Sequence, residues 1–173
     1  MTTLHGALLE VHGVGVLLLG PSGVGKSECA LELVSRGHRL VADDVVELEA
    51  GPDGTTIGRA PQRVRHYMEI RGLGIIFIPD LFGPDRVRDE MAVDLVCRLE
   101  HWQEGAEYDR LGLERVTEEV GGATVAALRL PARPGASMAT IVDVAAREHQ
   151  LRRSGVVAAR RLDARLRSEM QRS

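Results

Sequence analysis

Apolar residues near the start of the chain follow two different periodicities. Residues 14–19 (VGVLLL) are apolar or glycine throughout, which is typical of a strand buried on both faces in the middle of a sheet. After a glycine-rich stretch, apolar residues recur at helical spacing from Ser27 until Gly37, which suits a helix C-cap. The apolar positions of this helix are Cys29, Ala30, Leu33 and Val34. The pattern predicts a strand, a loop and a helix in direct succession.

Further apolar runs bounded by turn residues predict four more strands, at residues 39–48, 72–79, 91–99 and 124–130. Residues 59–71 are polar without a clean period, and residues 102–114 are expected to form a loop.

Two helices are expected near the C-terminus. Residues 137–155 carry apolar residues at helical spacing, and a basic helix follows from residue 156. The apolar positions are Met138, Ile141, Val142, Val144 and Ala145. Together these elements predict an α/β domain with a central sheet and helices at one side and at the C-terminus.

The length of 173 residues suits one domain with a sizeable core. Hydrophobic residues make up 44% and charged residues 27%, which excludes disordered and collagen-like classes. The net charge of -3 gives no electrostatic reason to expect a nucleic-acid partner. The arginines of the last helix are typical of a solvated face, with a surface for an acidic partner as the alternative.

Cys29 and Cys97 lack the spacing of a metal or redox motif and are expected to be buried, unpaired thiols. No charged and apolar leader precedes Leu4, and no apolar run is long enough to cross a bilayer. We therefore expect no membrane association and a reduced cytoplasmic location.

Residues 20–27, GPSGVGKS, match the phosphate-loop pattern G-x-x-x-x-G-K-[ST]. Backbone N–H groups of such a loop converge on phosphate oxygens, while the lysine neutralises the outer phosphates and the serine holds Mg²⁺. The alternative is a glycine turn with a solvated lysine, which the flanking strand and helix disfavour. The predicted nucleotide-binding residues are Gly20, Pro21, Ser22, Gly23, Val24, Gly25, Lys26 and Ser27.

Asp43 and Asp44 lie late in the strand expected at residues 39–48. Because side chains alternate along a strand, only one of the two is expected to point at the phosphate loop. A carboxylate there can bind Mg²⁺ or accept a proton from an incoming hydroxyl, and the alternative is an exposed acidic strand end. The spacing does not choose between base and metal ligand.

Over nearly its whole length the chain resembles the C-terminal catalytic domain of bacterial HPr kinase/phosphorylase. The phosphate loop is common to many unrelated proteins, whereas RGHRLVADD together with EIRGLGI is specific to this family. The segments that carry the resemblance are LHG at 4–6, GPSGVGKSECALELVSRGHRLVADDVVEL at 20–48, GRAP at 58–61, MEIRGLGII at 68–76, LFG at 81–83, YDRLG at 108–112 and IVDVAARE at 141–148.

The resemblance implies a phosphoryl transfer from ATP, or in some members pyrophosphate, to a serine of the phosphocarrier protein HPr. Inorganic phosphate reverses the modification in this family. It also implies a core similar to the nucleotide-binding domain of phosphoenolpyruvate carboxykinase, and assembly as a homohexamer. Residues 1–173 are then expected to form the catalytic domain alone, without the family's N-terminal domain.

The resemblance further implies roles for particular residues. Asp44 is the base that takes the serine proton and the acid that returns it, and Asp43 supports it or binds the metal. The implied catalytic residues are His5, Lys26, Asp44 and Arg110, and the implied Mg²⁺ ligands are Ser27 and Glu69. From the residues alone, His5 could be a solvated histidine, Glu69 a structural ion-pair partner of Arg71, and Arg110 an ordinary loop arginine.

One stretch departs from the family pattern. Relatives tend to carry Gly-Arg-Asn where this chain has Gly135, Ala136 and Ser137, and the family ties this loop to phosphorolysis. Serine cannot replace the bidentate phosphate contacts of arginine, so the kinase direction is better supported than the reverse reaction. Two other functions stay open: a phosphate-loop kinase with a different protein or small-molecule acceptor, and a non-catalytic nucleotide-sensing regulatory module.

Overall fold

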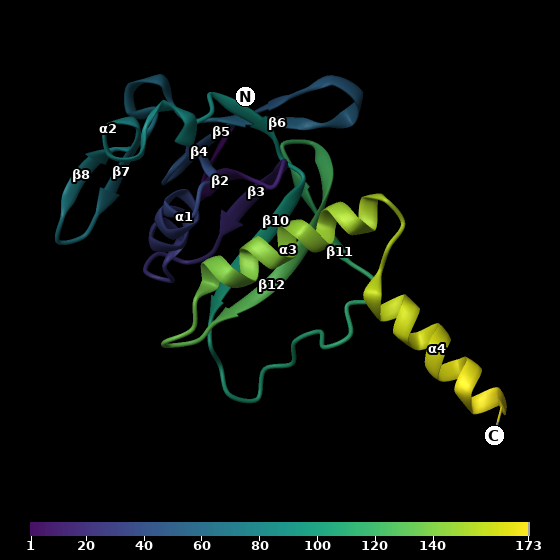
Figure 1. Ribbon diagram of the computed structural model, residues 1–173. Helices are drawn as coiled ribbons and strands as arrows, with labels where there is room; N and C mark the ends of the chain where they lie inside the picture. The colour runs from purple at the N-terminus through teal and green to yellow at the C-terminus, as the bar shows by residue number, and fades with distance from the viewer. Residues whose placement is uncertain (173) are drawn as a thin grey trace.

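The computed structural model of the chain describes residues 1–172 and centres on a six-stranded mixed sheet (Figure 1). The strand order is β11-β12-β10-β3-β2-β4; β12, β10 and β3 run parallel, and the remaining pairs are antiparallel. These strands are β2 (Ala7–Val11), β3 (Val14–Leu19), β4 (Arg39–Ala42), β10 (Leu95–His101), β11 (Val116–Val120) and β12 (Ala123–Ala132). The predicted α/β class with a central sheet is confirmed.

A second, antiparallel sheet has the order β1-β5-β6-β9, and a separate hairpin is formed by β7 and β8. Its strands are β1 (Thr2–His5), β5 (Val45–Ala50), β6 (Thr56–Arg59) and β9 (Glu90–Ala92). The hairpin strands are β7 (Tyr67–Ile70) and β8 (Gly74–Phe77). The hairpin protrudes at one end of the molecule in Figure 1.

The helices are α1 (Lys26–Ser35), α2 (Ile78–Phe82), α3 (Met138–Arg153) and α4 (Ala158–Arg172), with short 3-10 turns η1 (Pro52–Gly54), η2 (Gln62–Val64) and η3 (Pro84–Arg86). The terminal helix α4 has no buried residue and extends away from the sheets (Figure 1). Within residues 1–172, no helix is long and apolar enough to cross a membrane.

Three layers result from the alternation of side chains along the buried strands. In β3, Val14, Val16 and Leu18 pack with residues of α1 and α3. Leu17 and Leu19 point the other way and pack with residues of the four-stranded sheet. Because both faces of β3 are covered, every residue of the strand is apolar or glycine, and each fully buried Leu or Val contributes about 1.5–3 kcal/mol. The sequence prediction for residues 14–19 is confirmed.

Two neighbouring segments of the chain connect the four-stranded sheet to the six-stranded sheet, and they cross between the sheets side by side. The first segment runs from β1 through Gly6 into β2, and the second runs from β4 through Asp43 and Asp44 into β5. The Gly6 N–H donates to the Asp44 carbonyl at 3.0 Å, which ties the two crossings together. A Cβ on Gly6 would lie 2.7 Å from the Leu18 carbonyl oxygen, so the close approach requires glycine.

The single strands predicted at residues 39–48 and 91–99 are therefore wrong, because each run is divided between two sheets. Asp44 has a φ of 69°, which lies outside the strand region. In residues 91–99, the Val93 N–H donates to the Thr56 carbonyl of the four-stranded sheet. The next N–H, of Asp94, donates to the Gly15 carbonyl of the six-stranded sheet, and both distances are 2.8 Å. Apolar residues lie on both sides of each crossing because both sheets share one buried interface, and the crossings themselves carry aspartates.

The buried strand predicted at residues 72–79 is also wrong. Its residues form β8 of the protruding hairpin, where Ile75 is 74% exposed, and then α2. The segment 59–71, for which no element was expected, contains the partner strand β7. Strands β1, β2 and β11 were likewise not predicted from the sequence.

In α3, the helix is confirmed and its apolar positions are confirmed in part, since Val142 is buried and Met138 and Ala145 pack against the core. The smaller residues Ala139, Val142 and Ala146 are buried, whereas Ile141 and Val144 are exposed. Small side chains allow the helix to lie close to the sheet. Both cysteines are buried and unpaired as expected, and burial raises the pKa of each thiol to about 12.

We expect Gly6→Ala to lower the free energy of unfolding by about 1–3 kcal/mol, because the added methyl group meets a backbone oxygen in the joint between the sheets. Urea denaturation followed by circular dichroism measures the change. Gly51→Ala is the matched control, since the atoms nearest to its Cβ would be side-chain atoms of Thr55 and Ile57 and not backbone atoms. Equal losses in the two variants would contradict the importance of the crossing.

Candidate functional site

The phosphate loop connects β3 to α1 and has the backbone path that its glycines allow. Gly20 has a φ of 148°, and a Cβ there would lie 2.4 Å from the Leu99 carbonyl oxygen of β10. Gly25, with a φ of 104°, precedes the first residue of α1, Lys26. The loop therefore presses against the end of β10 and leads directly into the positive end of the helix dipole.

The Lys26 side chain folds back over the loop. Its Nζ donates to the carbonyl oxygen of Gly20 at 2.7 Å and to that of Pro21 at 3.1 Å. These two oxygens hold the ammonium group at the loop, where a phosphate group would compete with them for it. The role of Lys26 towards the outer phosphates stays a prediction.

Ser27 and Asp43 are joined directly. The Ser27 hydroxyl donates to the Asp43 carboxylate, with distances of 3.0 Å to Oδ1 and 3.1 Å to Oδ2. Burial raises the pKa of Asp43 from 3.8 to about 6; the hydrogen bond from Ser27 lowers it, and the neighbouring charge of Asp44 raises it. A hydroxyl and a carboxylate at this separation offer the hard oxygen donors that Mg²⁺ prefers.

Asp44 and His5 lie together at the surface beside the loop. The His5 Nδ1 is 3.9 Å from Asp44 Oδ1, and the two side chains are 83% and 84% exposed. An exposed pair at this distance contributes little to stability. His5 also lines a cavity of about 580 Å³ with Gly20 and Pro21, the first residues of the loop.

A cavity of about 360 Å³ collects most of the predicted site residues. Both aspartates line it, but Asp43 hydrogen-bonds Ser27 of the loop whereas Asp44 lies exposed beside His5, which fits the expectation that one of the two points at the phosphate loop. The two differ because they lie in a turn with a left-handed backbone at Asp44 and not because of strand alternation. The cavity is lined by Gly6, Ser22, Gly23, Gly25, Lys26, Ser27, Glu28, Asp43, Asp44, Glu69 and Arg71. The β7–β8 hairpin and its turn contribute Glu69 and Arg71.

Arg110 is not brought to this cavity. It lies in the loop between β10 and β11 and lines a different cavity of about 670 Å³, together with Arg115 and Glu148. In Figure 1 this connection runs outside the sheet. Of the predicted catalytic residues, Arg110 is the one that the structure leaves apart from the phosphate loop.

A family model described as HPr Serine kinase C-terminal domain matches residues 1–166. The chain belongs to this family. Among its relatives, a protein named HPr kinase/phosphorylase from Bacillus licheniformis is 52% identical over 158 residues, which cover 91% of this chain and 51% of that protein. The protein of the same name from Bacillus subtilis (strain 168) is 50% identical over 158 residues, with the same coverage of both chains.

A solved structure described as the Hpr(Ser) kinase/phosphatase from Coxiella burnetii superimposes on the chain with a TM-score of 0.82 and 34% identity. The match covers 90% of this chain and 94% of that one. The chain spans about half the length of the two Bacillus relatives. This chain therefore shares with the two Bacillus relatives the C-terminal domain of the HPr Serine kinase family.

Sequence reasoning missed three members of the cavity: Gly6, Glu28 and Arg71. The sequence suggests Arg71 only as an ion-pair partner of Glu69, yet no ion pair joins the two within the described residues 1–172, and both line the cavity. Glu28 follows the loop motif immediately, which was an available signal. Nothing in the local sequence around Gly6 points to the loop, because the two meet only through the crossing of the sheets.

A pH-dependent cost of burying Asp43 follows from its raised pKa. Between pH 4 and 6 the native state binds more protons at this group than the unfolded state does, so stability falls as pH rises through this window. We expect Asp43→Asn to remove this slope and to be more stable than the parent above pH 6, by about 1–3 kcal/mol, in the absence of divalent metal.

Urea denaturation at several pH values in the presence of a chelator measures this effect. Asp85→Asn, at an exposed aspartate, controls for the loss of one negative charge. Parallel stability curves for the parent and Asp43→Asn between pH 4 and 7 would contradict the assignment of the raised pKa to Asp43.

Proposed function

We propose that the chain is the catalytic domain of an enzyme that transfers a phosphoryl group from ATP to a serine of the phosphocarrier protein HPr. The observation that carries the proposal is the meeting of three groups at one cavity: the phosphate loop, the Ser27–Asp43 pair and the exposed carboxylate of Asp44. The names of the relatives support HPr as the acceptor. Phosphoryl transfer depends mainly on positioning and charge, which these groups supply.

Backbone N–H groups of the loop and the N-terminus of α1 bind the phosphate oxygens of the donor. Lys26 turns from the Gly20 and Pro21 carbonyls towards the outer phosphates, because a phosphate oxygen carries more negative charge than a carbonyl. Val24 and the remaining loop residues shape the cradle. The lysine then neutralises charge on the group that is transferred.

The oxygen donors of the cavity fit Mg²⁺. Ser27 and Asp43 are already within hydrogen-bond distance of each other, and Glu69 lines the same cavity. When bound, Mg²⁺ neutralises phosphate charge during the transfer. The buried position of Asp43 makes its charged form costly, and a bound cation would remove that cost.

Asp44 is the group that accepts the proton from the incoming serine hydroxyl. Its side chain is 84% exposed, so a serine on the surface of another protein can reach it without opening the fold. His5, 3.9 Å away, is placed to hold the carboxylate in position or to share the proton. Sites for small molecules usually enclose most of the ligand, so this exposure favours a macromolecular acceptor.

Arg110 acts on the transferred phosphoryl group only if it approaches the phosphate loop. It lies in the loop of residues 102–115, so its proposed catalytic role requires either a movement of this loop or its supply by a second copy of the chain. The proposed homohexamer would provide such a copy.

The similarity to the nucleotide-binding core of phosphoenolpyruvate carboxykinase and the cytoplasmic location stay predictions.

The kinase direction is the one we propose. Ala136, whose side chain carries no charge, lines a cavity together with Val24 and Gly25 of the phosphate loop. The Ser137 hydroxyl is the N-cap of α3 and accepts a hydrogen bond from the Thr140 N–H. Neither residue offers a cation to an incoming phosphate. Arg133 lines the same cavity, but its guanidinium lies over the Trp102 ring at 4.0 Å.

We expect the chain, given Mg²⁺ and labelled ATP, to place label on a serine of HPr, and Asp44→Asn to lower this rate about 10²- to 10⁴-fold, as the loss of a general base does. ATP binding is expected to persist in Asp44→Asn, because the side chain is 84% exposed and pairs with His5, whereas Asp43 is the aspartate that hydrogen-bonds the loop. Phosphoamino-acid analysis and isothermal titration with a non-hydrolysable ATP analogue measure the two effects.

One control variant and two possible outcomes separate the alternatives. Asp85→Asn, at an exposed aspartate outside the cavity, should keep the parent rate. ATP hydrolysis or transfer to a small molecule without HPr labelling would indicate the small-molecule kinase. Tight nucleotide binding with no transfer by the parent chain would contradict the kinase and favour a nucleotide-sensing module.

A further inference from the structure

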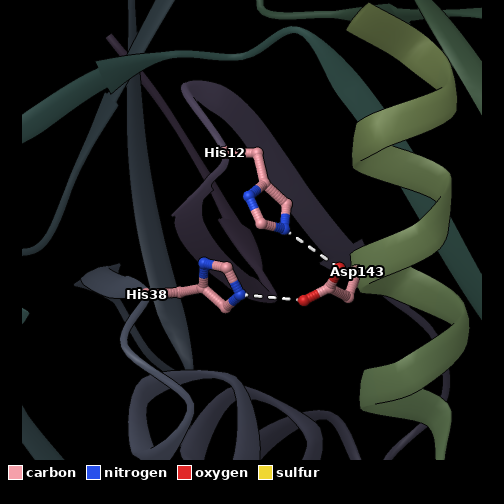
Figure 2. A group of neighbouring side chains, drawn as sticks. All are labelled: His12, His38 and Asp143. Carbon is pink, nitrogen blue, oxygen red and sulfur yellow. Dashed lines mark hydrogen bonds and ion pairs between the residues drawn. The ribbon is translucent and has the colours of Figure 1, made fainter.

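A cluster of two histidines and one aspartate lies outside the phosphate-loop cavity and takes no part in the proposed reaction. His12 lies in the turn between β2 and β3, His38 lies between α1 and β4, and Asp143 projects from α3. Both imidazole rings point their Nε2 atoms at the carboxylate of Asp143, as Figure 2 shows. His12 Nε2 is 3.0 Å from Oδ1, and His38 Nε2 is 3.0 Å from Oδ2.

The cluster is largely buried and held from three directions. The side chains of His12, His38 and Asp143 are 26%, 11% and 17% exposed. The two rings meet edge to face, with centroids 4.7 Å apart. His12 has a φ of 52°, a left-handed conformation that turns its side chain out of the strand pattern and is uncommon for residues other than glycine.

Its chemistry is that of a three-ligand transition-metal site. Neutral imidazole and carboxylate bind Zn²⁺ at about 2.0–2.2 Å, so neighbouring ligand atoms in a tetrahedral site lie roughly 3.3 Å apart. One ligand atom from each of the three residues lies within 4.8 Å of the others, so small side-chain adjustments bring them to that spacing. Two histidines with one carboxylate leave a fourth position for water.

We propose that His12, His38 and Asp143 bind one divalent transition-metal ion of the Zn²⁺ type through the two Nε2 atoms and a carboxylate oxygen. Such an ion clamps the β2–β3 turn and the chain after α1 to α3. The helix α1 begins with Lys26 and Ser27, so the clamp fixes the far end of the element that carries the phosphate loop.

Arg147 is the group that competes with the metal. Its Nε donates to Asp143 Oδ1 at 2.8 Å, the same oxygen that His12 contacts, and its side chain is 63% exposed. The alternative to a metal site is a hydrogen-bonded cluster in which both histidines donate Nε2–H groups to the carboxylate. Removal of Arg147 distinguishes the two alternatives. In a metal site it frees Asp143 Oδ1 for the ion and tightens metal binding. In a hydrogen-bonded cluster it only removes one donor from the Asp143 carboxylate.

The test uses the full chain after treatment with a chelator, in millimolar Mg²⁺ so that the phosphate-loop carboxylates are occupied. Co²⁺ is titrated and followed by its visible absorption, which reports a site of low coordination number with nitrogen ligands, and Zn²⁺ is then added in competition. We expect the chain to bind one equivalent of Co²⁺, and one equivalent of Zn²⁺ to displace it. Zn²⁺ at a hundred times its dissociation constant should raise the melting temperature by about 5–10 °C.

Variants assign the site. His12→Asn keeps a residue that tolerates the left-handed turn, and Asp143→Asn keeps the side-chain shape; each should weaken binding about a hundredfold or more. Arg147→Gln should tighten it about two- to fivefold. His101→Asn, at an exposed histidine of β10, is the matched control and should bind as the parent does.

Absence of both the Co²⁺ spectrum and the Zn²⁺-dependent stabilisation in the parent chain would overturn the proposal, and this result does not depend on whether any variant folds. Binding that survives in His12→Asn and Asp143→Asn but is lost in Asp43→Asn would overturn it as well, by assigning the ion to the phosphate-loop cavity. Neither readout involves phosphoryl transfer, so the proposal stands or fails independently of the kinase activity.

Discussion

Backbone hydrogen bonding at the joint between the two sheets is the constraint on which the site depends. The β1–β2 and β4–β5 segments change sheets at the same level, and the Gly6 N–H to Asp44 carbonyl bond holds them together there. Asp43 and Asp44 therefore occupy a turn instead of a strand. This places one carboxylate against Ser27 and leaves the next one exposed beside His5. Two adjacent residues of the same type thereby acquire different environments.

The difference in environment is also a division of chemistry. Asp43 is largely buried and hydrogen-bonded to the loop serine, which raises its pKa and makes it a costly charge until a cation is bound. Asp44 is 84% exposed, so its carboxylate stays in contact with water. Stability lost by burying Asp43 is thus linked to binding at the same cavity, as is common where a fold holds charged groups ready for a ligand.

Local signals were sufficient for the phosphate loop. The apolar run of residues 14–19, the glycines and the onset of helical spacing at Ser27 all lie within one short stretch, and the structure has the expected strand, loop and helix. The sequence also predicts that one of the two aspartates points at the phosphate loop, but not which of Asp43 and Asp44 does so. That choice depends on the left-handed backbone at Asp44, which no local pattern indicates.

Features that depend on tertiary contacts were beyond such reasoning. Apolar residues stand on both sides of the aspartates in residues 39–48 and 91–99, so each segment is read as one strand although it changes sheets at those aspartates. Ile75 lies in an apolar run typical of a buried strand, yet the hairpin that carries it protrudes. His12, His38 and Asp143 come together only because α3 packs against α1 and β3, and their separation in the sequence hides the cluster.

A crystal structure of the chain with Mg²⁺ and a non-hydrolysable ATP analogue tests the central claim most directly. We expect the β- and γ-phosphates in the loop of residues 20–27, Lys26 Nζ moved from the Gly20 carbonyl to the phosphates, and Mg²⁺ bound by Ser27 and Asp43 with Asp44 free and facing the γ-phosphate. A nucleotide bound elsewhere, with Lys26 still on its own loop and Ser27 still hydrogen-bonded to Asp43, would contradict it.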